Sequence, residues 1–167
     1  MTQDTKYKIL SIDTSCDETS VSITQGIIVL SNIIWSQASL HAEWGGVVPS
    51  LAKREHEKRI DWIIQKALKT AGVKIEDLNA VAVTIGPGLA IALEVGIGKA
   101  KDISKKYNLP FIPVNHIEGH LLSPLARPKN FQFPIVNFHF LDFDFWDLGI
   151  CSTWCNKFSS DFKEQMN

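Results

Sequence analysis

The first part of the chain alternates hydrophobic and polar residues with the period of β-strands. Residues 8–14 are rich in β-branched and aliphatic side chains and end in a polar turn, and residues 19–25 and 26–37 have the composition of two further strands. Short turns join the three segments. The pattern therefore predicts an antiparallel meander at the start of the fold.

A long helix is predicted after the meander. Pro49 stands at a suitable first helical position, and Gly72 stands where the left-handed residue after a helix is expected. Apolar residues between these two positions recur at helical spacing, namely Leu51, Ala52, Ile60, Ile63, Ile64, Ala67 and Leu68. One face of this helix should therefore lie in the core.

The rest of the regular pattern alternates strand and helix. Residues 80–85 read as a buried strand that runs into a glycine-rich turn and a helix to about residue 106, and residues 111–114 form another strand before a helix from about residue 116. The order βββαβαβα predicts an α/β fold with a mixed sheet flanked by helices. This is the order of one ribonuclease-H-like lobe of actin-like proteins, which bind nucleotide between two such lobes.

Composition narrows the functional classes. With 45% hydrophobic residues in 167, the chain can form a packed core. Because 17 basic residues face 18 acidic ones, no overall positive field attracts nucleic acid, so any RNA contact should be local or shared with a partner. The absence of a long apolar run and the odd count of three cysteines lead us to expect a cytoplasmic protein with reduced thiols and no membrane contact.

An acidic turn follows the first predicted strand, and its polar residues are Asp13, Thr14, Ser15, Cys16, Asp17 and Glu18. Amides and hydroxyls in such a turn can bind a phosphate, and its carboxylates can orient a cation or a proton. The alternative is an Asx-type turn that only connects two strands. A second turn, Gly86-Pro87-Gly88, lies between a buried strand and a helix, where backbone can approach a phosphate or merely a neighbouring segment.

Two histidines at helical spacing are the candidate metal ligands. His116 and His120 would lie one turn apart on the same face of a helix, as in helices that present two imidazoles to one metal ion. Glu118 would project from another face, so a third ligand must come from elsewhere. The alternative is a helix start with two solvated histidines.

A glycine-rich loop with His41 and Trp44 precedes the long helix. Its aromatic and basic groups suit a nucleotide or RNA. The alternative is that the run that follows, Lys53, Arg54, Glu55 and His56, is a solvated helix face, as charges of alternating sign usually are. In the segment after Pro134, Cys151 and Cys155 form a C-x-x-x-C pair that has no second pair and indicates ordinary thiols.

Four segments together resemble the TsaD (Gcp) family, which transfers a threonylcarbamoyl group to N6 of adenosine 37 in tRNAs reading ANN codons (t6A). They are IDTSCDETSVSI, HAEWGGVVPSLAKREHEKRI, AVTIGPGLAIALEVGIGKAK and PVNHIEGHLLSPLA, in family order. The resemblance implies an acyltransferase of tRNA modification with the actin-like (ASKHA) fold. It also implies that His116 and His120 hold one iron, or zinc, ion per subunit and that Asp17 and Glu18 are catalytic.

The same resemblance places substrate-binding residues at Ser15, His41, Gly86 and Gly88. The resemblance implies that the metal holds threonylcarbamoyl-AMP, so that N6 of the tRNA adenosine attacks the activated carbonyl and AMP leaves. The implied partners are tRNA, threonylcarbamoyl-AMP, a homologous TsaB-type subunit and a small TsaE-type ATPase. The alternatives are a non-catalytic module that only binds the partner subunit, and an actin-like small-molecule kinase, in which the NHIEGH segment would have no role.

The family pattern covers residues 1–134, and residues 135–167 depart from it. The serine-glycine-glycine turn that binds the adenylate, the second lobe and the third metal ligand have no counterpart there. We expect this tail to come from a frameshifted or wrongly joined reading frame, or else to be a genuine variant ending. The sequence therefore predicts a truncated, inactive copy with the second lobe largely missing.

Overall fold

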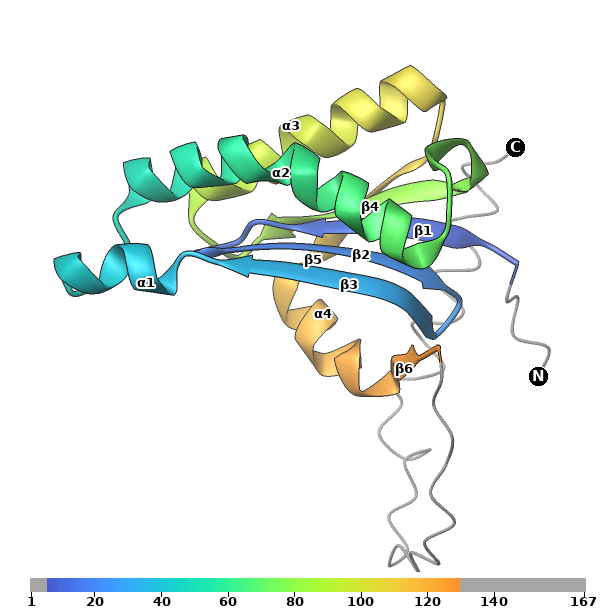
Figure 1. The fold of residues 1–167 in the computed structure, drawn as a ribbon, viewed down its shortest axis with the longest axis horizontal. Coiled ribbons are helices and arrows are strands. Elements are labelled where there is room, and N and C mark those ends of the chain that lie inside the picture. The colour runs from blue at the N-terminus through green and yellow to red at the C-terminus, as the bar shows by residue number, and fades with distance from the viewer. Residues whose placement is uncertain (1–5, 130–167) are drawn as a thin grey trace, which may run out of the picture. The chain divides into compact units, whose positions relative to one another are not determined.

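The computed structural model describes residues 6–129 of the chain, and these form a sheet flanked by helices (Figure 1). The strands, in chain order, are β1 (Lys8–Asp13), β2 (Glu18–Gln25), β3 (Ile28–Ser36), β4 (Ala80–Gly86), β5 (Phe111–Asn115) and β6 (Arg127–Pro128). The helices are α1 (Ala38–His41), α2 (Pro49–Ala71), α3 (Ala90–Tyr107) and α4 (His116–Leu122). Short 3-10 turns occur at Ala42–Trp44, Ile75–Asp77 and Ser123–Leu125.

The sheet has the order β5-β4-β1-β2-β3-β6, and only β2 runs against its neighbours. Strands β1 to β3 form the predicted meander. Strands β4 and β5 extend it on the other side of β1, in parallel, because α2 and α3 carry the chain back across one face. The predicted α/β ribonuclease-H-like lobe with a mixed sheet is confirmed.

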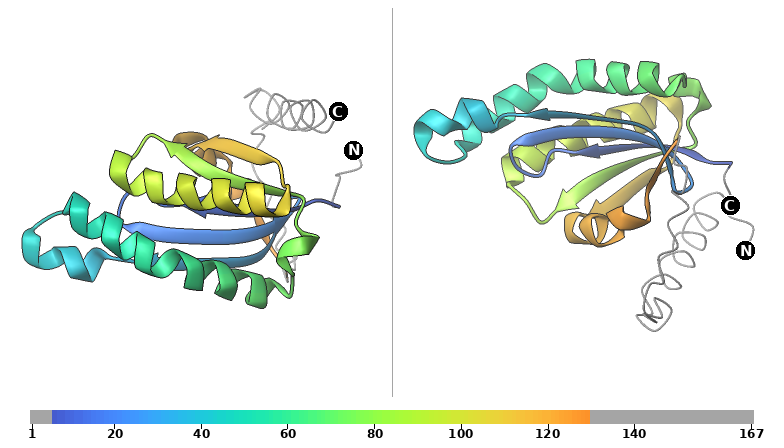
Figure 2. Two further views of the ribbon diagram at one scale, coloured as in Figure 1. Left: turned by 90° about the horizontal axis from the view of Figure 1, so that it is seen from above. Right: turned by 60° about the horizontal axis from the view of Figure 1, so that its bottom comes forward.

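Helices α2 and α3 lie together over one face of the sheet, and α4 lies on the opposite side (Figures 1 and 2). Helix α2 begins at Pro49, as predicted, and Gly72 follows it in the left-handed conformation with φ 70°. Its buried side chains include Ile60, Ile63 and Ala67, which pack with apolar residues of β1, β2 and β4 in one core. This burial of one apolar helix face on the sheet is the main force that holds the lobe together.

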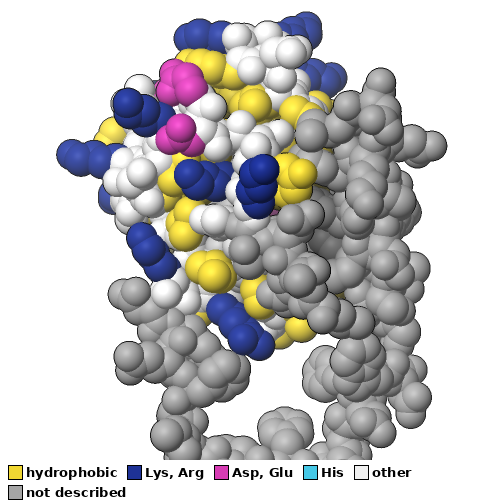
Figure 3. All heavy atoms as spheres, turned by 90° about the vertical axis from the view of Figure 1, so that its right-hand side faces the viewer, with side chains coloured by type: hydrophobic (Ala, Val, Ile, Leu, Met, Phe, Trp, Pro, Cys, Tyr) yellow, Lys and Arg dark blue, Asp and Glu magenta, His cyan; other side chains and the backbone are white. Residues whose placement is uncertain are grey.

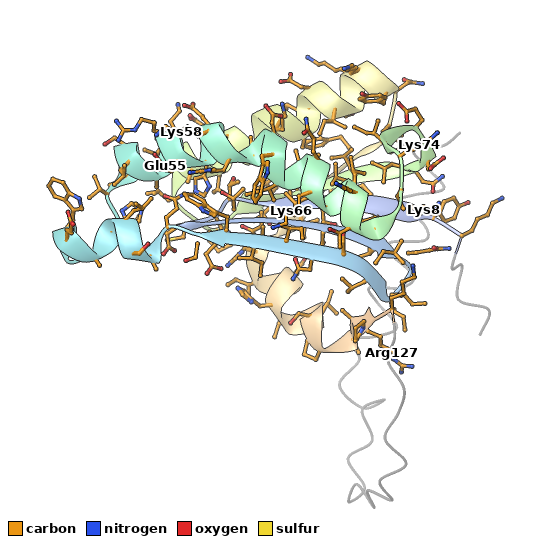
Figure 4. All side chains as sticks on the ribbon, in the orientation of Figure 1. Lys8, Glu55, Lys58, Lys66, Lys74 and Arg127 are labelled. Atoms are coloured by element: carbon orange, nitrogen blue, oxygen red, sulfur yellow. The ribbon has the colours of Figure 1, made fainter. Side chains whose placement is uncertain are left out.

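Charged residues of α2 form two ion pairs, one with the buried Glu55 and one at the surface. Lys58 lies one turn from Glu55 (Figure 4), and its Nζ is 2.6 Å from Oε1 of that glutamate. Lys53 pairs with Glu94 of α3 at 3.6 Å. The exposed Lys53–Glu94 pair contributes little to stability, about 0–1 kcal/mol.

Basic side chains do not gather into one stripe on the face seen in Figure 3. Lys and Arg side chains in its visible, described part stand apart, with hydrophobic side chains between them. Among the helices of residues 6–129, none has both the length and the apolar character needed to cross a membrane. The predicted boundary at Pro134 lies outside the described residues, as do Cys151 and Cys155 of the tail.

Candidate functional site

The candidate site lies where three parallel strands end at the same edge of the sheet. Strands β1, β4 and β5 run in the same direction, so the residues at their carboxyl ends, Asp13, Gly86 and Asn115, are brought together. Helix α4 begins directly after β5. This connection places its first residue, His116, beside Asp13, although 103 positions separate the two in the chain.

Asp13 is the centre of a hydrogen-bond network at this edge. Its Oδ2 atom is 2.9 Å from Nδ1 of His116 and accepts a hydrogen bond of 2.8 Å from the Thr84 hydroxyl of β4. Its Oδ1 atom accepts one of 2.7 Å from the Ser15 amide. Burial alone would raise the pKa of Asp13, but the hydrogen bonds from Ser15, Thr84 and His116 outweigh it and hold that pKa below its usual value. Asp13 is therefore an ionised acceptor at neutral pH.

The charge of Asp13 fixes the tautomer of His116. An ionised carboxylate can only accept, so Nδ1 of His116 must carry the hydrogen that it donates to Asp13. The other ring nitrogen, Nε2, is then left with a lone pair. A carboxylate behind a histidine in this way is the usual support of a histidine metal ligand.

His116 and His120 point their outer nitrogens at one another. Helix α4 forms here because the Asn115 side chain accepts hydrogen bonds from the amides of Ile117 and Glu118 and so caps its amino end. The predicted one-turn spacing holds, and the two Nε2 atoms are 2.9 Å apart. Both side chains are accessible at the surface.

This separation fits a shared metal ion. Two imidazole nitrogens that each lie about 2.0–2.1 Å from one ion are roughly 3 Å apart. The residues present therefore suit one transition metal on the Nε2 side, with Asp13 on the Nδ1 side. Within residues 6–129 no third histidine, cysteine, aspartate or glutamate completes a cluster of metal ligands. The assignment of His116 and His120 as ligands of a metal ion stays a prediction, and the tail after Pro134 lies outside the described residues.

The acidic turn between β1 and β2 lies next to this network in the chain. The Asp17 backbone oxygen accepts a hydrogen bond of 2.9 Å from the Gln37 amide, and Glu18 is exposed as the first residue of β2. In the described residues, no hydrogen bond or ion pair joins either carboxylate to His116 or His120. The catalytic role of Asp17 and Glu18 stays a prediction.

Cys16, in the same turn, is exposed, yet it is a poor nucleophile. Partial burial raises the pKa of its thiol, and the Asp17 carboxylate beside it raises it further. The thiol is therefore protonated at neutral pH, and only the thiolate would be reactive.

The two turns that the sequence singled out are packed against one another. The backbone oxygen of Ser15 accepts a hydrogen bond of 2.7 Å from the Leu89 amide, and a Cβ placed on Gly88 would lie 2.6 Å from that oxygen. Gly86 has a φ of 148°, which residues other than glycine rarely adopt. Glycines are thus needed at both positions for close approach and for backbone conformation, while their role in substrate binding remains a prediction.

His41, predicted as a substrate contact, is buried inside its own loop. Its Nε2 is 3.1 Å from Oε1 of Gln37, and its Nδ1 accepts a hydrogen bond of 3.3 Å from the Val48 amide. These bonds fix the loop that carries Trp44, whose side chain is 69% exposed. A cavity of about 310 Å³ lies beside this loop, lined by Trp44, Val48, Ser50, Leu51 and Arg54.

Sequence reasoning missed three side chains that organise this region. Asp13 was grouped with the acidic turn but not separated from it, although its place at the end of a strand parallel to two others could have marked it. Thr84 stands near the end of the adjacent buried strand β4. His56 was grouped with solvated charges, yet it lies four residues from both Ala52 and Ile60 on the buried face of α2.

Curated proteins that resemble this chain are tRNA N6-adenosine threonylcarbamoyltransferases. The tRNA N6-adenosine threonylcarbamoyltransferase of Pelagibacter ubique (strain HTCC1062) is 52% identical over 134 residues, which cover 77% of this chain and 38% of that protein. The enzyme of the same name from Persephonella marina (strain DSM 14350 / EX-H1) is 46% identical over 132 residues, with the same coverage. The chain thus spans about 38% of the length of these curated relatives.

Among solved structures, YeaZ from Pseudomonas aeruginosa is 22% identical, with a TM-score of 0.48 over 65% of this chain and 44% of YeaZ. This likeness is too low to bear on function. The family model that matches describes TsaD, tRNA N6-adenosine threonylcarbamoyltransferase, and it matches residues 28–139, which are more than half of the chain. The chain belongs to the TsaD family of transferases.

Proposed function

We propose that this chain provides the first lobe of a tRNA N6-adenosine threonylcarbamoyltransferase. The reaction is transfer of the threonylcarbamoyl group from threonylcarbamoyl-AMP to N6 of adenosine 37 in tRNAs that read ANN codons. The observation that carries the proposal is the meeting of Asp13, His116 and His120 at the edge of the sheet, in a chain of this family. An actin-like kinase would have no use for this histidine pair.

His116 and His120 would hold one iron or zinc ion through their Nε2 atoms. A bound ion of this kind supplies a Lewis acid that polarises the carbonyl under attack. Asp13 keeps the lone pair of His116 on the outer side, and Thr84 holds Asp13 in place. With two ligands in residues 6–129, a further ligand would come from outside the described part of the chain.

The acidic turn and the glycine turn would hold the reactants beside this pair. In the proposed reaction, the adenosine N6 forms a bond to the carbonyl carbon, the bond to the AMP oxygen breaks, and N6 loses a proton. Asp17 or Glu18 would orient or accept that proton, because they are the accessible carboxylates of the turn. Ser15, Gly86 and Gly88 would set the backbone conformation of the two turns, and this backbone would bind a phosphate.

The proposed partners follow from the family. They are tRNA, threonylcarbamoyl-AMP, a TsaB-type homologous subunit and a TsaE-type ATPase, in the cytoplasm. Residues 6–129 contain no group of three or more side chains that could hold a metal ion, and they form one sheet with its helices. We therefore propose that the lobe described here does not catalyse the transfer unaided. Catalysis needs the carbonyl and the attacking nitrogen in one geometry, and contacts from a second lobe would supply much of it.

A chimera tests the proposal. Residues 8–129 of this chain replace the matching part of the 52% identical Pelagibacter ubique protein, and t6A formation is measured with tRNA, threonylcarbamoyl-AMP and the partner subunits. We expect the chimera to be active and its His116→Ala variant to be inactive. Glu118→Ala is the matched control, because it alters the same helix on another face. An active His116→Ala chimera, or an inactive parent chimera that is folded, would contradict the proposal.

A further inference from the structure

His56 of α2 is completely buried, with 0% of its surface exposed, and both of its ring nitrogens have partners. Nδ1 is 2.7 Å from the hydroxyl oxygen of Thr19, and Nε2 is 3.0 Å from the backbone oxygen of Cys16. Thr19 is also fully buried, near the start of β2. The histidine therefore connects the helix layer to both ends of the short segment that carries Asp17 and Glu18.

The partners determine the direction of both hydrogen bonds. A backbone carbonyl can only accept, so Nε2 of His56 carries the hydrogen and donates it to Cys16. Nδ1 then accepts from the Thr19 hydroxyl. This is the neutral imidazole, in agreement with burial, which lowers the pKa of His56. One ring nitrogen therefore donates a hydrogen bond and the other accepts one.

Packing alone does not explain a histidine at this position. Its neighbours on the buried face of α2 are Ala52 and Ile60, and an apolar side chain of similar size would fill the space without a polar group to satisfy. Only a side chain with a hydrogen-bond donor can bond to the backbone oxygen of Cys16, and an apolar side chain has none. Without it, the carbonyl of Cys16 would lose its partner on the interior side of the turn.

We propose that His56 is a positioning residue for the reaction, because it fixes the acidic turn through the backbone of Cys16. The turn has a second attachment, because the backbone amide of Gln37 donates a hydrogen bond to the backbone oxygen of Asp17. The carbonyl groups of Cys16 and Asp17, which belong to consecutive peptide groups, are therefore both held. Two such points define the orientation of the peptide from which the Asp17 side chain projects. The proposal rests on the proposed function, since it assumes that Asp17 or Glu18 acts in transfer.

Two isosteres of histidine separate positioning from packing. The amide nitrogen of glutamine reaches about as far as Nε2, so His56→Gln keeps a donor for Cys16. Asparagine reaches only as far as Nδ1, so His56→Asn keeps the contact with Thr19 and loses the donor. Asparagine is also one methylene smaller than glutamine, so the loss of packing must be measured separately from the loss of the donor.

The first measurement is amide hydrogen exchange of the 167-residue chain by mass spectrometry. In His56→Asn, we expect residues 14–19 and the Gln37 amide to exchange about five- to tenfold faster than in His56→Gln, the factor that one net hydrogen bond gives. Peptides of β4 report global stability, so any difference that they show between the two variants is divided out before the turn is compared. Equal exchange of the turn in both variants would overturn the proposal.

The second measurement is transfer by the chimera that carries each variant. We expect His56→Asn to lower kcat at least tenfold with little change in KM for tRNA, and His56→Gln to restore most of it. Faster exchange of the turn without any loss of kcat would overturn the positioning role. If the chimera with His56 intact were inactive, the proposed function would fail, while the exchange data would still decide whether His56 holds the turn.

Discussion

Substitution of Gly88 by alanine tests the contact between the two turns at the edge of the sheet. The new Cβ would lie 2.6 Å from the backbone oxygen of Ser15 and 3.0 and 3.1 Å from its Cβ and Cα atoms. Such distances require one turn to move. Because two of the three atoms belong to the backbone, no flexible side chain can rotate away to relieve the contact.

The cost follows from what must shift. Overpacking of a tight contact costs about 1–3 kcal/mol, and displacement of Ser15 also weakens the 2.7 Å bond from the Leu89 amide, worth about 1 kcal/mol net. We therefore expect Gly88→Ala to lower the free energy of unfolding by roughly 2–4 kcal/mol. The backbone conformation of Gly88 adds nothing to this, because its φ is not in the left-handed region.

Gly98→Ala is the matched control. Gly98 is exposed in the middle of α3, and no atom lies within 4 Å of a Cβ added there. Alanine should stabilise the helix by up to about 1 kcal/mol. Urea unfolding followed by circular dichroism measures both changes, and a chain with Gly98→Ala as background keeps Gly88→Ala measurable if the lobe is marginally stable. A Gly88→Ala change within 0.5 kcal/mol of zero would refute the contact argument.

Three further outcomes are expected. His120→Ala should abolish the retention of iron or zinc by the chain, measured by elemental analysis after dialysis, because one imidazole is left. Asp17→Ala in the chimera should remove transfer and change the unfolding free energy by no more than about 0.5 kcal/mol. The free energy of unfolding should fall as the pH drops below about 6.5, by at most about 1.4 kcal/mol per pH unit, because His56 takes up a proton on unfolding. Unfolding curves at several pH values measure this dependence, and His56→Gln should remove it.

The sign of this pH effect depends on what surrounds His56. Burial lowers its pKa, the bond to the Cys16 backbone and the charges of Asp13 and Asp17 raise it, and His41 lowers it, with a net decrease. The unfolded chain therefore binds a proton that the folded chain does not, and acid favours unfolding. The stabilisation is complete above pH 6.5 and is lost progressively below it, until the folded pKa is reached. Stability that rises as the pH falls from 7 to 5 would contradict this assignment.

The elements that could be predicted from the sequence are those in which buried hydrophobic residues recur with the period of a helix or a strand. Helix α2 was predicted from Pro49 to Gly72 because its core positions recur at helical spacing and both ends carry local signals. Helix α1 and strand β6 were missed, because four and two residues are too short to show a period. Their positions depend on the rest of the fold: β6 is set by its pairing with β3.

The candidate site was predictable only where its residues are close in sequence. His116 and His120 lie one turn apart, so helix geometry alone brought them together, and the structure keeps that spacing. The partnership of His116 with Asp13 spans 103 positions and exists only because β1 and β5 are parallel with β4 between them. No local pattern contains that information. Strand order does, once it is combined with the polar residues that follow each strand.

The same reasoning explains why the burial of His41 and His56 was not predicted. A histidine beside charged residues resembles a solvated group, and its sequence neighbours say nothing of a partner on another element. The decisive contacts of His56 are with Cys16 of the turn, 40 positions away, and with Thr19 of β2, 37 positions away. A polar residue at a core position of a predicted helix should therefore prompt a search for the backbone group that it binds. Here that group belongs to the acidic turn, so a residue of the helix layer bears on the geometry of the site without touching a substrate.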